Sequence, residues 1–238
     1  MGKKLKNLLK IGLVGLSSML PAKKAHGQIR GDISTDFTNS YLTNGFSFNN
    51  YPTVFINGNI GVNSGNYSLT LTGIHSRDIR NHFNGKTSWI EKTGMMDISR
   101  NLGIGTLSFG GYVTFLPEDV FGIDYVTGVS GSFTTSSNPS FRAYLERGMH
   151  NLTGWLGKVS VSASENVLSR PVNANLTMGA MDSYFIDKRG LHFMRLGLNT
   201  PAYSSGNFSV TAGANYQMGI GENSVSGLAA KLTARANF

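Results

Sequence analysis

The stretch that decides the fold is residues 227–238, which reads GLAAKLTARANF. Apolar side chains recur at every second position, at Ala230, Leu232, Ala234, Ala236 and Phe238. The positions between them carry polar side chains: Lys231, Thr233, Arg235 and Asn237. A period of two is that of a β-strand, because successive side chains of a strand point to opposite faces. Residues 227–238 therefore predict a strand with one apolar and one polar face.

The same alternation recurs along the chain from Gln28 onward. Counting every such run predicts about twelve strands, at 29–41, 52–62, 66–75, 89–99, 104–115, 124–134, 139–147, 154–163, 171–181, 191–199, 207–216 and 227–238. Most of these runs match the roughly 9–11 residues of a tilted membrane strand, whereas soluble strands average about 5–6. The sequence thus predicts an all-β fold, a transmembrane antiparallel up-and-down β-barrel with an even number of strands.

A sheet in lipid closes on itself, because each unpaired edge group would cost several kcal/mol there. The first and last predicted strands must then pair with each other. Their inward faces carry Asp32 and Asp36 on the first strand, and Lys231 and Arg235 on the last. We therefore expect opposite charges to meet across the seam of the barrel.

The composition agrees with a membrane barrel and excludes several other classes. Apolar residues make up 40% of the 238 residues and charged residues only 14%, while glycine alone accounts for 30 positions. This balance suits an apolar outside and a neutral polar inside. The chain has no run of 18 apolar residues, so the sequence predicts no membrane-spanning helix. The absence of cysteine excludes disulfides and thiolate chemistry.

The first 27 residues have the layout of a secretory signal peptide. A basic segment is followed by the short apolar block 11–20, by Pro21, and by Ala25-His26-Gly27, which provides small residues for cleavage. We expect a signal peptide at 1–27 and a barrel at 28–238; an amino-terminal amphipathic or anchoring helix is the alternative. Six lysines of the formal +8 charge lie in this segment, so the remainder is nearly neutral and predicts no nucleic-acid partner.

The connections are expected to alternate between long outer loops and short inner turns. If the first strand starts in the periplasm, the outer loops are 42–51, 76–88, 116–123, 148–153, 182–190 and 217–226. The inner turns 63–65 and 100–103 are short. Two segments depart from the pattern, because 148–153 is short and 164–170 is long for its side. Aromatic residues near the strand ends predict interfacial girdles: Tyr41, Phe55, Trp89, Phe115, Tyr125, Trp155 and Tyr216.

Two family resemblances follow from these residues. The final Phe238 after alternating apolar positions resembles the carboxyl-terminal signal of bacterial outer-membrane barrels. This resemblance implies recognition by the barrel-assembly machinery, so deleting Phe238 or replacing it with Asp should block assembly and leave export intact. The segment from Ser40 to Phe46, followed by Pro52-Thr53-Val54, resembles the first hairpin of bacterial porins without an assigned substrate. Asn44 stands where those porins usually have Arg.

The inward ionisable residues are the candidates for a functional site. They are Asp32, Asp36, Glu91, Asp97, Arg142, Glu146, Lys158, Arg195, Lys231 and Arg235. Either they line a narrow pore for small solutes, or they fill the lumen with ion pairs, since Arg142, Glu146 and Lys158 lie on neighbouring strands. The sequence favours a porin-like channel for passive diffusion in the outer-membrane lipid. The alternative is a non-conducting structural or adhesive barrel.

No pattern in the chain predicts enzymatic chemistry. The five histidines lack the spacing of metal ligands, and no G-x-S-x-G motif occurs. We therefore expect no catalytic group, no metal and no cofactor. A barrel-wall hydrolase and a soluble secreted β-sandwich remain as minor alternatives.

Overall fold

The computed structural model describes residues 28–44, 46–49, 51–79, 90–116, 125–151, 153–167, 169–183, 189–220 and 224–238. The predicted signal peptide, residues 1–27, and Trp89 lie outside these residues. The described residues form strands only, and they include no helix that is long and apolar enough to cross a membrane.

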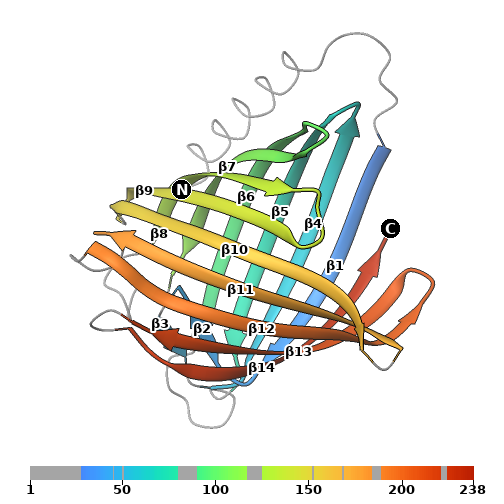
Figure 1. Ribbon diagram of the computed structural model, residues 1–238. Helices are drawn as coiled ribbons and strands as arrows, with labels where there is room; N and C mark the ends of the chain where they lie inside the picture. Colours follow the sequence, from blue (N-terminus) through green and yellow to red (C-terminus); the bar gives the residue numbers. More distant parts are fainter. Residues whose placement is uncertain are drawn as a thin grey trace.

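Twelve long strands form a closed barrel (Figure 1). The strands are β1 (Gln28–Thr38), β4 (Thr53–Ser64), β5 (Tyr67–Asp78), β6 (Ile90–Asn101), β7 (Gly105–Phe115), β8 (Tyr125–Thr135), β9 (Ser140–His150), β10 (Gly154–Val167), β11 (Arg170–Asp182), β12 (Arg189–Ser205), β13 (Phe208–Gly219) and β14 (Gly227–Asn237). Each pairs antiparallel with its neighbours in the chain, and β1 pairs with β14. The predicted fold class and all twelve predicted strands are confirmed.

Large apolar side chains cover the outside of this barrel. Ile33 is 53% exposed, Phe109 61%, Val159 59% and Leu228 62%. They alternate with polar residues that face the lumen, as the period of two requires. An exterior of this kind is stable against lipid and would be unstable in water.

The connections differ strongly between the two ends of the barrel. At the end that holds Gln28 and Phe238, two to four residues join β4 to β5, β6 to β7, β8 to β9, β10 to β11 and β12 to β13. The expected long turn at 164–170 is wrong, because β10 continues to Val167 and β11 begins at Arg170. The opposite end carries the longer connections, with the short segment 151–153 between β9 and β10 as the exception. The difference in connection length between the two ends of the barrel is thus larger than the sequence predicted.

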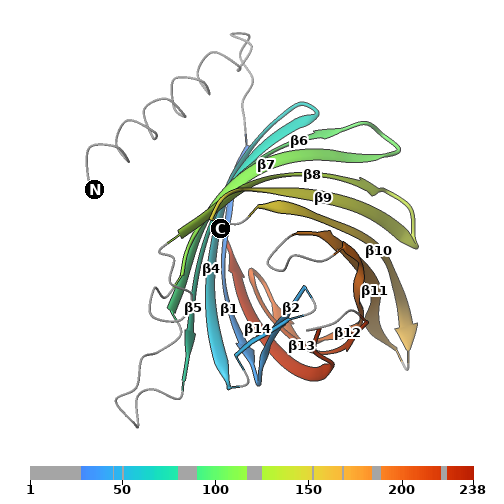
Figure 2. The same cartoon turned by 90° about the vertical axis from the view of Figure 1, so that its left-hand side faces the viewer.

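A small hairpin, which the sequence did not predict, lies between β1 and β4. It consists of β2 (Tyr41–Thr43) and β3 (Phe46–Asn49), paired antiparallel. The segment was expected to form an outer loop. Figure 2 shows β2 inside the ring of barrel strands, and β2 contacts β14. The connection therefore folds back into the lumen instead of extending away from the barrel.

Interior glycines make room for large side chains in the narrow lumen. The ring of Tyr112 on β7 lies over Gly128 on β8, and that of Phe193 on β12 lies over Gly179 on β11. A Cβ atom at either glycine would overlap the ring. Close packing of this kind fills part of the barrel interior with protein atoms.

Candidate functional site in the barrel lumen

The seam between β1 and β14 brings the predicted opposite charges together. Lys231 Nζ lies 2.8 Å from Asp36 Oδ2, and Arg235 Nε lies 3.6 Å from Asp32 Oδ1. The hydroxyl of Thr233 also donates to Asp36, at 2.7 Å. The expected pairing across the seam is confirmed, and it neutralises these four side chains inside the barrel.

Polar contacts of the described residues join the hairpin to the barrel wall. The Tyr41 hydroxyl donates to Glu91 Oε2 on β6 at 3.3 Å. Arg195 Nη2 on β12 donates to the carbonyl oxygen of Leu42 at 3.3 Å, and Lys158 Nζ on β10 donates to Asn44 Oδ1 at 3.5 Å. Because β6, β10 and β12 are separate strands of the closed ring, these contacts hold the hairpin across the lumen (Figure 2).

An apolar contact anchors the other strand of the hairpin. Phe46 packs against a buried cluster of Val126, Leu156 and Met181, and its ring centroid lies 4.9 Å from that of His192. Asn44 lies two residues before Phe46. Its φ of 50° is a left-handed conformation, which Asn adopts more readily than most residues. This conformation gives Asn44 a local role in the turn between β2 and β3.

Two aromatic residues expected in the interfacial girdles lie inside the barrel instead. Tyr41 and Phe55 meet edge to face with ring centroids 4.9 Å apart, and both line a cavity beside the hairpin. Burial and the neighbouring Glu91 carboxylate raise the pKa of the Tyr41 phenol above its ordinary value. The phenol therefore stays protonated and keeps its hydrogen bond to Glu91. Trp155 and Tyr216, by contrast, are 39% and 50% exposed, as girdle residues would be.

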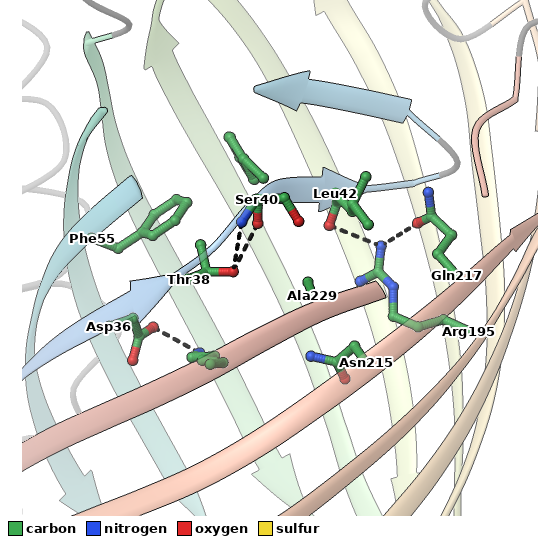
Figure 3. A pocket seen from close by; sticks show the side chains of 11 residues that line it. Asp36, Thr38, Ser40, Leu42, Phe55, Arg195, Asn215, Gln217 and Ala229 are labelled. Carbon is green, nitrogen blue, oxygen red and sulfur yellow. Dashed lines mark hydrogen bonds and ion pairs between the residues drawn. The ribbon is translucent and has the colours of Figure 1, made fainter. Parts of the chain in front are cut away.

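The cavity beside the hairpin is the candidate functional site. It has a volume of about 210 Å³ and lies between the hairpin and the inner wall formed by β1, β12, β13 and β14 (Figure 3). Its lining comprises Asp36, Thr38, Ser40, Tyr41, Leu42, Phe55, Arg195, Asn215, Gln217, Ala229 and Lys231. A second cavity of about 360 Å³ shares Asp36 and Lys231 with it and is also lined by Arg235. The two cavities therefore adjoin at the seam.

A second polar cluster lies on β9 and β10. Glu146 accepts hydrogen bonds from the hydroxyls of Tyr112, at 2.6 Å, and of Tyr144. Lys158 Nζ lies 4.3 Å from the centroid of the Tyr144 ring, and the Arg142 guanidinium lies 5.5 Å from it. Tyr144 thus contacts both the acid and the two bases that were expected to pair with it. Asp97 lies over Gly110 on β7.

Sequence reasoning identified three charged residues of the cavity, namely Asp36, Arg195 and Lys231, but missed its neutral polar residues. Asn215 and Gln217 occupy inward positions of β13, which the alternation with Ala214, Tyr216 and Met218 indicates. No alternation in the sequence predicts that Ser40 and Leu42 line the cavity, because they do so only when the hairpin folds into the lumen.

The structure resembles solved bacterial outer-membrane barrels. An outer-membrane channel from Pseudomonas putida F1 matches with a TM-score of 0.52 at 9% sequence identity, over 92% of this chain and 100% of that one. The translocator domain of the autotransporter NalP from Neisseria meningitidis gives a TM-score of 0.45 at 12% identity, over 98% and 96%. The β domain of the Bordetella autotransporter BrkA also gives 0.45, at 13% identity over 90% and 100%.

The chain has the fold of a bacterial outer-membrane β-barrel. No protein-family model and no curated protein matches its sequence. These solved barrels are a channel and two autotransporter domains, and because they are at most 13% identical to this chain, the likeness concerns the fold alone. Within the described part of this barrel, no group of three or more His, Cys, Asp or Glu side chains could hold a metal ion.

Proposed function

We propose that this barrel is a narrow outer-membrane channel through which small polar solutes diffuse passively. The observation that carries the proposal is the pair of adjoining cavities inside the closed ring, which are lined by both polar and apolar side chains and run from the seam to the hairpin. The ten inward ionisable residues would line this path. The apolar exterior and the fold support a place in the outer membrane.

The hairpin would form the narrowest part of the channel. It crosses the lumen on the side of the longer connections, and its contacts with β6, β10 and β12 leave the cavity of about 210 Å³ as the space beside it. A lumen of twelve strands is already narrow, since its size lies between filled eight-stranded and open sixteen-stranded barrels. Solutes larger than a simple sugar would therefore be excluded.

A non-conducting barrel is the second candidate, and one observation favours it. The cluster of Val126, Leu156 and Met181 with Phe46 closes part of the lumen with apolar side chains. A barrel filled in this way would serve a structural or adhesive role. The outer-membrane lipid and the barrel-assembly machinery would be its partners in either case. We expect no catalytic activity from either form.

Liposome swelling tests the proposal. Purified barrel is reconstituted into liposomes, which are then diluted into isotonic arabinose, glucose or sucrose. We expect fast swelling in arabinose, slower swelling in glucose and almost none in sucrose. Liposomes that behave like protein-free controls in all three sugars would favour the filled barrel.

A further inference from the structure

The guanidinium of Arg195 has only neutral hydrogen-bond partners in the lumen. Arg195 Nη2 donates to Gln217 Oε1 at 2.6 Å and to the carbonyl oxygen of Leu42 at 3.3 Å (Figure 3). No carboxylate among the described residues forms an ion pair with it. A guanidinium has five N–H donors, and both bonds use Nη2, so the donors on Nε and Nη1 remain available at the cavity.

The other charges of this cavity cancel each other. Lys231 and Asp36 form an ion pair of 2.8 Å, and Thr233 and Asn57 also donate to the same carboxylate. Asp36 therefore has little capacity left to compensate Arg195. The cavity keeps one net positive charge, which lies next to the hairpin.

Two neutral polar groups face the same space. Asn215 lines the cavity, and its side chain makes no hydrogen bond within the described residues. Ser40 also lines it, and its buried Oγ has no hydrogen-bond partner in that part of the chain. An unsatisfied buried hydroxyl is costly, and rotation about its Cα–Cβ bond would present it to a bound solute.

We propose that this cavity is a binding subsite for small hydroxylated carboxylates, with the carboxylate on Arg195 and the hydroxyls on Asn215 and Ser40. The proposal names the solute class of the channel and so rests on the proposed function. The Nε and Nη1 donors lie on opposite edges of the guanidinium, and Nη2 is already bonded, so the carboxylate accepts one charge-assisted hydrogen bond, from Nε or from Nη1. The cavity is smaller than the roughly 300–1,000 Å³ of drug-sized sites, so the solute is small.

Calorimetric titration of the full barrel in detergent tests the subsite, with gluconate as probe and glucose and acetate as comparisons. We expect gluconate to bind more tightly than either, because only gluconate has both a carboxylate and hydroxyls. Arg195→Gln should weaken gluconate binding at least about tenfold, since it removes a charge-assisted hydrogen bond. Asn215→Ala should weaken gluconate binding and leave acetate binding unchanged.

Arg100→Gln is the matched control. The Arg100 guanidinium lies over the Tyr67 ring on the outer surface, 5.2 Å from its centroid, so gluconate binding should be unaffected. Wild-type affinity for gluconate in a correctly folded Arg195→Gln barrel would overturn the subsite. Equal affinities for gluconate and glucose in the wild type would do the same. If Arg195→Gln does not fold, the Asn215→Ala titrations decide, because unchanged gluconate binding in that variant also contradicts the subsite.

The proposed function and the subsite fail in different ways. Arg195-dependent gluconate binding without solute passage in liposomes would refute the channel and support the subsite. Solute passage without gluconate binding would support the channel and refute the subsite.

Discussion

At the scale of single residues, Phe238 and Gly31 extend the pairing of β1 with β14 by one more pair of residues. The backbone N–H of Phe238 donates to the carbonyl oxygen of Gly31 at 2.9 Å, and that of Gly31 donates to the carbonyl oxygen of Phe238 at 3.0 Å. The Phe238 ring covers Gly31, where a Cβ atom would overlap it, and is 69% exposed on the outer surface. The contact therefore requires glycine at position 31, where a side chain would overlap the ring, and an apolar ring at position 238 that is stable against lipid.

Replacing Phe238 with Asp is expected to lower the amount of assembled barrel in the membrane. A carboxylate would lose the contact over Gly31 and would place a charge against lipid. The amount of folded barrel in isolated outer membranes measures the effect. Phe238→Tyr, which keeps the ring, is the control and should assemble. Assembly of Phe238→Asp at the wild-type level would contradict this role.

The seam ion pair should contribute more stability than an exposed pair. Asp36 and Lys231 side chains are 14% and 38% exposed, whereas those of Asp182 and Arg189 are 44% and 81% exposed at 2.7 Å. A double-mutant cycle with Asp36→Asn and Lys231→Met is expected to give a coupling of about 1 kcal/mol in denaturant unfolding. The same cycle with Asp182→Asn and Arg189→Met should give about 0.3 kcal/mol or less. Equal couplings would show that the lumen does not strengthen the seam pair.

At the scale of elements, the hairpin β2–β3 is held by Phe46 more than by its own two strands. A short isolated hairpin is marginally stable, so its position depends on contacts with the wall. Phe46→Ala removes the ring from the cluster of Val126, Leu156 and Met181, and should destabilise the docked hairpin by about 2 kcal/mol. Hydrogen exchange should then accelerate in 41–43 and 46–49 and stay slow in β1 and β4.

Phe208→Ala provides the control for that experiment. Phe208 is 43% exposed on the outer face of β13, so its removal should leave exchange in the hairpin unchanged. Unchanged exchange in Phe46→Ala would mean that Phe46 does not anchor the hairpin.

The wall strands could be predicted from the sequence and the hairpin could not. Strands such as β6, β9 and β14 repeat a period of two over eleven or twelve residues, and lipid on one side makes that period strict. Strand β2 has three residues, too few to establish a period. Its place is set by Glu91, Lys158 and Arg195, which are distant in the sequence. The girdle prediction was therefore wrong for Tyr41, and for Phe55, which packs against it.

At the scale of the whole molecule, the closed ring should resist detergent. Every wall strand has two neighbours, so no edge offers a start for unfolding. We expect unheated protein to migrate faster than boiled protein in SDS gels, because the barrel stays compact until heat opens it. Carbonate washing should leave it in the membrane fraction. Identical migration, with release by carbonate, would fit a soluble β-sandwich instead.

We propose that solutes cross this barrel through the space beside the hairpin. Single-channel conductance in planar bilayers tests this path, for the wild type and for a variant in which a short Gly-Ser linker replaces residues 40–50. We predict small, regular conductance steps for the wild type and clearly larger steps for the variant, since the linker removes the hairpin from the path. Equal conductance in both, or none in either, would contradict the claim.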